Sequence, residues 1–215
     1  MARIVITSGP TRQYLDPVRY LTNASSGRMG TALAQAALEL GHRVTIVTGP
    51  VTIAYPEQAE IVRVTTTDEM LSATREAFEE ADGLIGAAAP CDYRPVHVHA
   101  QKMSKTGEPV TLSLVETPDI VATLGASKKS QQWVVGFALE TEDRRFKAIV
   151  KMQKKCCDLM VSNGPSAIDS PDNEVEVLDR NGSVLASLQG AKDRVASQLM
   201  AIIDARLIRS IKVCS

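Results

Sequence analysis

Short runs of β-branched residues alternate along this chain with longer segments of helical periodicity, and this alternation constrains the fold most. Strands that alternate with helices build βαβ units whose strands lie parallel. We therefore predict an α/β fold, a Rossmann-like, doubly wound and mostly parallel sheet with helices on both faces. The predicted core strands are Arg3–Thr7, Arg43–Thr48, Ile61–Thr65, Gly83–Ala89, Trp133–Phe137 and Asp158–Ser162.

The helix boundaries carry their own signals. A helix over Ser25–Leu40 is followed by Gly41, a residue typical of a C-terminal cap. Thr66 and Glu69 have the spacing of a capping box at the start of the next helix. In Thr117-Pro118-Asp119 we predict a cap, a proline at the first helical position and an acid in the first turn. Further helices are expected over Asp143–Lys155 and Lys192–Ile208.

Two features do not belong to the alternating pattern. Val110–Leu114 alternates like a strand, and turn residues at 179–182 separate the strand-like runs Glu174–Leu178 and Ser183–Leu188. We predict a small hairpin appendage over 174–188 and consider it a candidate dimer interface. The length of 215 residues suits a single domain over 1–215.

Composition excludes several classes of function. A formal net charge of −1 provides no basic field for nucleic acid, and no apolar run is long enough for a signal peptide or a membrane span. The four cysteines show no CxxC spacing, which excludes a disulfide framework or a zinc site. His97 and His99 would share a face of a strand but lack a third ligand, so we predict no protein metal site. We expect a soluble cytoplasmic protein.

Three segments next to strand ends are candidate ligand sites, because open α/β sheets bind ligands there. The long segment 8–26 ends in Ser25, Ser26 and Gly27 at a helix start, where backbone N–H groups and the helix dipole can hold an anion. An ordinary helix cap is the alternative. In 90–109, Asp92 follows the apolar strand, and Lys102 and Lys105 precede Gly107 in a loop that could cover phosphates. A solvated surface loop is the alternative.

The third segment is a basic helix face beside Phe137. Lys151 and Lys155 are four residues apart and project from one side of the predicted helix. An aromatic ring near cations is a plausible nucleotide site, although a solvated face would show the same pattern.

Absent motifs argue against other nucleotide enzymes. The first strand–helix turn lacks GxGxxG, no acid follows Arg43–Thr48, and neither a Walker A motif nor GxSxG occurs. An NAD(P)-dependent oxidoreductase and a non-catalytic nucleotide-binding module remain alternatives.

Together the loops resemble the phosphopantothenate–cysteine ligase family of coenzyme A biosynthesis. The chain departs from the family pattern at Pro90, Ser104, Leu139 and Gly164. The matching segments follow the family's order over most of the chain: Thr7–Arg12, Asp16–Asn23, Ser25–Gly30, Val44–Val51, Gly86–Arg94, Lys102, Thr117–Val121, Gly136–Thr141 and Asp158–Asn163.

The resemblance implies a reaction in two steps. The carboxylate of 4′-phosphopantothenate attacks CTP, with Mg²⁺ carried mainly by the triphosphate, to give an acyl-cytidylate and pyrophosphate. L-cysteine then forms the amide and releases CMP. By resemblance, Asn23 holds the activated carbonyl, Arg19 supports it or contacts substrate, and Lys102 is a mobile-loop cation. The resemblance assigns the nucleotide to Gly86, Ala87, Ala88, Ala89, Asp92, Lys102, Pro118, Asp119, Ile120, Val121, Phe137, Lys151 and Lys155.

The resemblance also implies partners. The family is usually dimeric, so we expect a homodimer. Many relatives fuse this domain behind a flavin-dependent decarboxylase, whereas the present sequence starts at the ligase motifs. We therefore expect no flavin, and a separate phosphopantothenoylcysteine decarboxylase as a functional partner.

Overall fold

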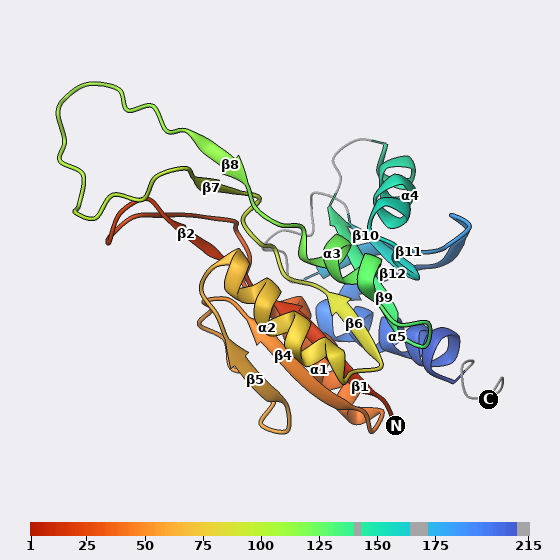
Figure 1. Ribbon diagram of the computed structural model, residues 1–215. Coiled ribbons are helices and arrows are strands. Elements are labelled where there is room, and N and C mark those ends of the chain that lie inside the picture. The colour runs from red at the N-terminus through yellow and green to blue at the C-terminus, as the bar shows by residue number, and fades with distance from the viewer. Residues whose placement is uncertain (140–142, 164–171, 210–215) are drawn as a thin grey trace.

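An eight-stranded sheet forms the centre of the molecule in the computed structural model, which describes residues 1–139, 143–163 and 172–209 (Figure 1). The strand order is β12-β11-β10-β9-β6-β1-β4-β5. The six strands from β10 to β5 run parallel, whereas β11 and β12 are antiparallel to their neighbours. The strands span Arg3–Ser8 (β1), Arg43–Thr48 (β4), Glu60–Arg63 (β5), Gly83–Gly86 (β6), Trp133–Leu139 (β9), Leu159–Asn163 (β10), Asp172–Asp179 (β11) and Val184–Ala191 (β12).

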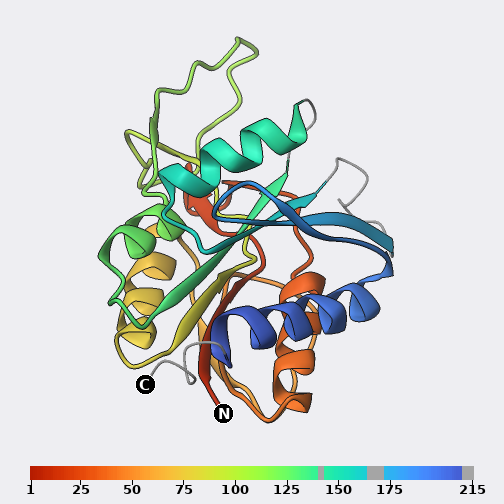
Figure 2. The same cartoon turned by 90° about the vertical axis from the view of Figure 1, so that its right-hand side faces the viewer.

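Helices cover both faces of this sheet, which confirms the predicted doubly wound architecture (Figure 2). Helices α1 and α5 lie on one face, and α2, α3 and α4 contribute to the apolar layer on the other. Across the described residues, no helix combines the length and the apolar character needed to cross a bilayer. The helices span Arg28–Glu39 (α1), Thr67–Glu79 (α2), Ile120–Ser127 (α3), Arg144–Lys154 (α4) and Lys192–Ile203 (α5).

Local sequence explains most of these elements. All four residues of β6 are buried, as expected for a strand with β9 and β1 on its two sides. Thr66 and Glu69 form the predicted capping box at the start of α2. Gly41 has the positive φ of a helix C-terminal glycine and donates its N–H to Leu38 O (2.9 Å). These short-range signals therefore place the parallel half of the sheet and its helices.

Several predicted elements differ from the structure; for example, the strand predicted over Gly83–Ala89 ends at Gly86. The hairpin is not an appendage, because β11 pairs with β10 and extends the main sheet. Helix α5 ends at Ile203 and continues as a π-helix over Asp204–Ile208. No strand covers Val110–Leu114; the strand there is β8, Leu114–Glu116. It pairs antiparallel with β7, Tyr93–Pro95, and this pairing decides where the strand lies.

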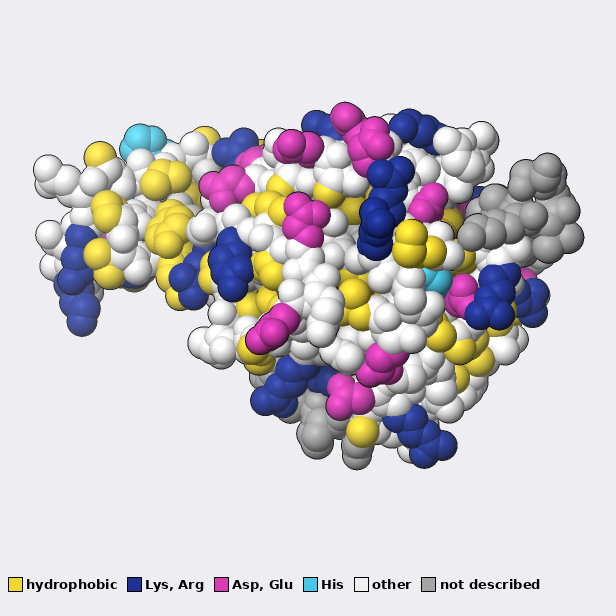
Figure 3. Space-filling view, turned by 90° about the horizontal axis from the view of Figure 1, so that it is seen from below, with side chains coloured by type: hydrophobic (Ala, Val, Ile, Leu, Met, Phe, Trp, Pro, Cys, Tyr) yellow, Lys and Arg dark blue, Asp and Glu magenta, His cyan; other side chains and the backbone are white. Residues whose placement is uncertain are grey.

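An arm projects from the body of the molecule, where the sequence had predicted irregular loops and a strand over Val110–Leu114 (Figure 1). It consists of residues 12–22 and 93–116, which include β7, β8, β2 (Arg12–Tyr14) and β3 (Tyr20–Thr22). The β2–β3 and β7–β8 pairs form two small antiparallel sheets. Figure 3 shows apolar side chains on the surface of the arm.

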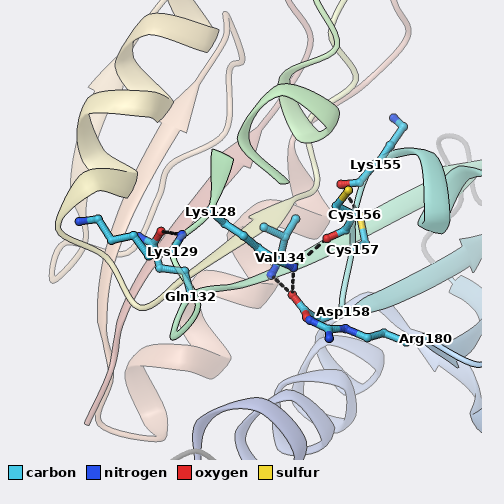
Figure 4. Close-up of polar contacts among 9 residues, drawn as sticks. All are labelled: Lys128, Lys129, Gln132, Val134, Lys155, Cys156, Cys157, Asp158 and Arg180. Carbon is cyan, nitrogen blue, oxygen red and sulfur yellow. Dashed lines mark hydrogen bonds and ion pairs between the residues drawn. The ribbon is translucent and has the colours of Figure 1, made fainter. Parts of the chain in front are cut away.

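A polar cluster around Asp158 lies just before β10, at the edge of the sheet opposite to the carboxyl ends of the parallel strands (Figure 4). Asp158 Oδ2 accepts hydrogen bonds from Val134 N (2.7 Å) and Lys128 Nζ (2.6 Å), and Arg180 pairs with Oδ1. Lys128 also donates to Cys156 O (2.7 Å). The cluster thus ties the end of α3 to β9, β10 and the hairpin.

Candidate active site

Two clefts open at the carboxyl ends of the parallel strands, where the sequence predicted ligand sites. The α1 cleft, of about 550 Å³, lies at the start of α1, and the α3 cleft, of about 510 Å³, lies at the start of α3. Ala88, Pro90, Asp92 and Phe137 line both. The two clefts therefore meet at the loop after β6 and at the aromatic ring on β9.

Most of the predicted site residues line these clefts. The α1 cleft contains Asn23, Ser25, Ser26, Gly27, Ala87, Ala89 and Lys151 besides the shared residues. The α3 cleft contains Gly86, Pro118, Asp119, Ile120, Val121 and Lys155. Lys151 and Lys155, predicted to serve one site, thus line different clefts, because one turn of α4 separates them where the two clefts diverge.

The start of α1 is shaped by Gly27 and not by a serine cap. Gly27 has a φ of 77°, a left-handed conformation that favours glycine, and no side chain caps the helix. Ser8 donates its hydroxyl to Gly27 O (3.2 Å), and Tyr55 donates its own to Ser8 Oγ (2.9 Å). The N–H groups of the first turn therefore have no capping side chain, which suits an anionic ligand. The predicted helix start at Ser25 is corrected to Arg28.

Asn23 is held toward the loop after β6. Its Nδ2 donates to Pro90 O (2.8 Å), and the side chain is half-buried in the α1 cleft. A carboxamide nitrogen carries two hydrogens, so a second N–H can serve a ligand. Asn23 therefore combines a fixed orientation with a donor for a carbonyl oxygen.

Buried hydroxyls hold the loop after β6, and the sequence analysis had assigned them no role. Cys91 N donates to Thr11 Oγ1 (2.8 Å), and the hydroxyls of Thr11 and Thr67 are 2.8 Å apart. Thr67 Oγ1 also accepts from Gln13 Nε2 (3.0 Å) and donates to Cys91 O (3.2 Å). All of these bonds are satisfied if Thr11 donates to Thr67. The only sequence signal was that Thr11 lies in a family motif.

Asp119 and Lys155 organise the α3 cleft. Asp119 caps α3 by accepting from Ala122 N (3.0 Å), and Lys155 Nζ lies 3.0 Å from Asp119 Oδ2. The predicted cap, Thr117, instead donates its hydroxyl to Cys91 O (2.7 Å), so that Pro118 lies before the helix and not in its first turn. This pair places one carboxylate and one ammonium beside the start of α3.

Lys102 and Arg19 belong to the arm. Lys102 is exposed, and neither residue is among those that line the two clefts in the described part of the chain. Arg19 donates to Met103 O (2.6 Å) and to Asp16 Oδ2 (2.8 Å), and Met103 N donates to the same Asp16 oxygen (3.2 Å). Burial alone would raise the pKa of Asp16, but hydrogen bonds from the Val18 and Arg19 backbone, the Arg19 side chain and Met103 hold it well below its usual value.

Asp92 is the carboxylate that both clefts share, and it is exposed. Among the described residues, no group of three or more His, Cys, Asp or Glu side chains could hold a metal ion. Mg²⁺ needs no such cage when substrate phosphates supply most of its ligands, and one carboxylate is then enough. The site thus fits a cation that arrives with a triphosphate.

Several residues in the α1 cleft were absent from the predicted site, and three of them are Asn163, Asn173 and Lys192. Asn163 lies in a family motif and was noted there without a role. Asn173 and Lys192 had no local signal, since their strand and helix reach the cleft through long-range pairing. The motif residues Glu140 and Thr141, and Gly164, where the chain departs from the family pattern, lie outside the described residues.

Comparisons with known proteins identify the family of this chain. Residues 1–207 match the family described as DNA/pantothenate metabolism flavoprotein C-terminal domain. The coenzyme A biosynthesis bifunctional protein CoaBC of Vibrio vulnificus (strain YJ016) is 43% identical over 178 residues, 80% of this chain and 44% of that protein. The chain spans about half the length of the curated relatives it matches.

Solved structures share the fold. The crystal structure of the C-terminal domain of CoaBC has a TM-score of 0.82 and 35% identity, covering 96% of this chain and 95% of that chain. A Cab2 variant in complex with phosphopantothenate-cysteine has a TM-score of 0.84 at 15% identity, covering 99% and 88%, which is a likeness of fold. The chain therefore belongs to the family of DNA/pantothenate metabolism flavoprotein C-terminal domains.

Proposed function

We propose that this chain is a phosphopantothenate–cysteine ligase of coenzyme A biosynthesis. In the first step a carboxylate oxygen of 4′-phosphopantothenate forms a bond to the α-phosphorus of CTP, and pyrophosphate leaves. In the second, the amine of L-cysteine forms a bond to the acyl carbon. The acyl C–O bond breaks, CMP leaves with the electron pair, and the nitrogen gives up its proton to solvent. The match to the C-terminal domain of a bifunctional coenzyme A biosynthesis protein supports this proposal.

The observation that carries the proposal is the junction of the two clefts at Ala88, Pro90, Asp92 and Phe137. A nucleotide in the α3 cleft and an acyl substrate in the α1 cleft would bring the α-phosphate and the carboxylate together there. Such placement replaces an encounter between two molecules in solution, which is a large part of catalysis for reactions of this kind.

Each cleft has groups suited to its proposed substrate. In the α1 cleft, the start of α1 at Gly27 would hold the phosphate of 4′-phosphopantothenate, and Asn23 would donate to the acyl oxygen. In the α3 cleft, Phe137 offers a stacking surface, and Lys155 an ammonium for the nucleotide. Asp92 would hold Mg²⁺ with the triphosphate, where it would neutralise phosphate charge.

We further propose a homodimer that forms through the arm. The arm displays many exposed apolar side chains, which is unusual for a surface that meets only water. The hairpin interface predicted from the sequence stays a prediction. Replacing Val96 and Val115 by Asp should shift the mass measured by light scattering toward the monomer. The exposed apolar residues of the arm are Val18, Tyr20, Tyr93, Val96, Val98, Val110, Leu112, Leu114 and Val115.

The reaction is tested by pyrophosphate release with 4′-phosphopantothenate and each nucleoside triphosphate, before cysteine is added. We expect release with CTP and Mg²⁺, and amide product only after cysteine is present. Because the relatives that match over this chain are longer, bifunctional proteins of coenzyme A biosynthesis, a decarboxylase activity should consume the product. Pyrophosphate release that strictly requires cysteine, or no release with any nucleotide, would contradict the proposed order.

Variants separate the proposed roles. Asn23→Ala should lower amide formation by about 10²–10³, since loss of one donor to a developing oxyanion costs that much. Lys102→Gln should slow pyrophosphate release by about two orders of magnitude with little change in CTP affinity, and Lys105→Gln should be milder. Equal losses in both lysine variants would mean that the loop only binds substrate.

A further inference from the structure

One corner of the α1 cleft has polar groups that the proposed roles leave unused. This amide corner consists of Asn163, Asn173 and Lys192, all of which line the cleft. Asn163 ends β10 and pairs in register with Val175 of β11, and Asn173 precedes Val175 by two residues. Residues two apart on a strand share a face, so both carboxamides lie on the side of the sheet that α1 and α5 cover.

The two carboxamides present acceptors without partners. Oδ1 of Asn163 and Oδ1 of Asn173 are buried and accept no hydrogen bond among the described residues. Asn173 is only 4% exposed. A buried carbonyl oxygen without a donor is unfavourable and rare in folded proteins, so such an atom at a cleft indicates a ligand that donates. Two neutral acceptors that line one cleft suit an ammonium or amine.

The same corner also attracts negative charge. Helix α5 begins at Lys192 after Ala191, and no side chain caps its N-terminus. The N–H groups of its first turn and the ammonium of Lys192 favour an anion. Asp193 in that turn would oppose this, but its side chain is exposed and does not line the cleft. The amide corner therefore combines hydrogen-bond acceptors, on the two asparagines, with a positively charged helix start at Lys192.

We propose that the amide corner binds the amino-acid co-substrate as a zwitterion. The amino group would donate to the carbonyl oxygens of Asn163 and Asn173, and the carboxylate would bind Lys192 and the start of α5. A phosphate group fits worse, because its oxygens are acceptors and would face two carbonyl oxygens. Asn23 lines the same cleft, so the bound amino group and the acyl carbonyl would share one cavity. The ammonium becomes the nucleophile once it has lost a proton to solvent. This inference rests on the proposed ligase function and assigns the cysteine subsite within it.

The test separates the two half-reactions in the full chain. Asn173→Ala and Lys192→Gln should raise the KM for L-cysteine in amide formation at least tenfold. Pyrophosphate release from CTP and 4′-phosphopantothenate without cysteine should stay within twofold of the parent rate. Asn173→Asp, which keeps an acceptor oxygen, should retain more cysteine affinity than the alanine variant. A merely structural role for the corner would disturb both half-reactions together.

Asn181→Ala is the matched control, since Asn181 lies in the turn at the far end of the same hairpin and should change neither step. Asn173 is buried and its variant can lose stability, so Lys192→Gln, at a half-buried position, repeats the test. An unchanged cysteine KM in Lys192→Gln, or a KM increase for 4′-phosphopantothenate instead, would overturn the inference. Absence of pyrophosphate release in the parent chain would instead refute the ligase function itself.

Discussion

The Asp158 cluster allows the effect of one substitution on stability to be worked out from the structure. The side chains of Asp158 and Lys128 are 6% and 14% exposed, and Lys128 Nζ lies 2.6 Å from Asp158 Oδ2. In Asp158→Ala, Val134 N loses its acceptor, and an unpaired buried donor costs about 1–3 kcal/mol. Lys128 loses its counter-ion, and breaking a buried ion pair on one side costs about 3–5 kcal/mol in all. We expect a loss of about 3–5 kcal/mol, a large part of a typical domain's stability.

The charge and the backbone contact can be separated. Burial and the nearby Arg180 lower the pKa of Lys128, so that lysine can lose its proton when Asp158 is absent, which limits the cost. Asp158→Ala combined with Lys128→Met removes the buried charge pair, so that Val134 N and Cys156 O lose these partners and the largely exposed Arg180 is left to solvent. The double variant should still be more stable than the single one by about 2 kcal/mol, because no buried charge remains without its counter-ion. Asp158→Asn keeps an acceptor for Val134 and should fall between parent and alanine.

Urea unfolding followed by far-ultraviolet circular dichroism, fitted with a common m value, measures these differences. Because the cluster lies at the edge of the sheet opposite to the clefts, the KM values of folded Asp158→Asn should match the parent. A cost below about 1 kcal/mol for Asp158→Ala, or a double variant no more stable than the single one, would refute the reasoning.

Three further predictions concern other parts of the molecule. Folding lowers the pKa of Asp16, so the ionised carboxylate stabilises the fold above the unfolded pKa of 3.8, and this stabilisation is lost in acid. In urea titrations, the free energy of unfolding should therefore fall less between pH 5 and pH 2 for Asp16→Asn than for the parent, and an equal fall would contradict this. Burial raises the pKa of Cys157 to about 12, whereas Cys156 is exposed, so iodoacetamide at pH 8 should label Cys156 faster than Cys157. Peptide mapping measures the two rates, and equal rates would disprove this prediction. In Gly125→Ala the new Cβ would lie 2.0 Å from the carbonyl oxygen of Lys155, so the free energy of unfolding should fall by about 1–3 kcal/mol. Calorimetry should also show weaker CTP binding, and an unchanged affinity would count against the α3 cleft as the nucleotide site.

Helix starts illustrate when local patterns succeed. The capping box of Thr66 and Glu69 was predicted correctly because both of its bonds lie within four residues. The start of α3 was predicted wrongly, although Thr117 has the right chemistry for a cap. Its hydroxyl is used by Cys91 O, which lies 26 residues away, so Asp119 takes over. A cap can therefore be read from sequence only when no distant acceptor competes for it.

In the candidate site, too, some positions could be predicted from local sequence and others depended on long-range pairing. The motif loops at Asn23, Gly27, Asp92 and Phe137 were placed together correctly, because the carboxyl ends of parallel strands share one edge of a sheet. Lys102, expected as a cation on a mobile loop, lies exposed on the arm and outside both clefts, and its role at the nucleotide stays a prediction. Its position depends on the pairing of β7 with β8, which the strand-like pattern at 110–114 did not predict.

By itself the sequence determined the parallel α/β core, the cap of α2 and the loops that carry the family motifs, because hydrophobic periodicity and capping act over a few residues. Only the tertiary structure decided that the hairpin extends the sheet, that the arm projects, and that Asn173 and Lys192 reach the α1 cleft. Those outcomes depend on the register between strands and on where α5 packs. Many pairings satisfy the same alternation of apolar residues, and only the packing of the whole chain selects one of them.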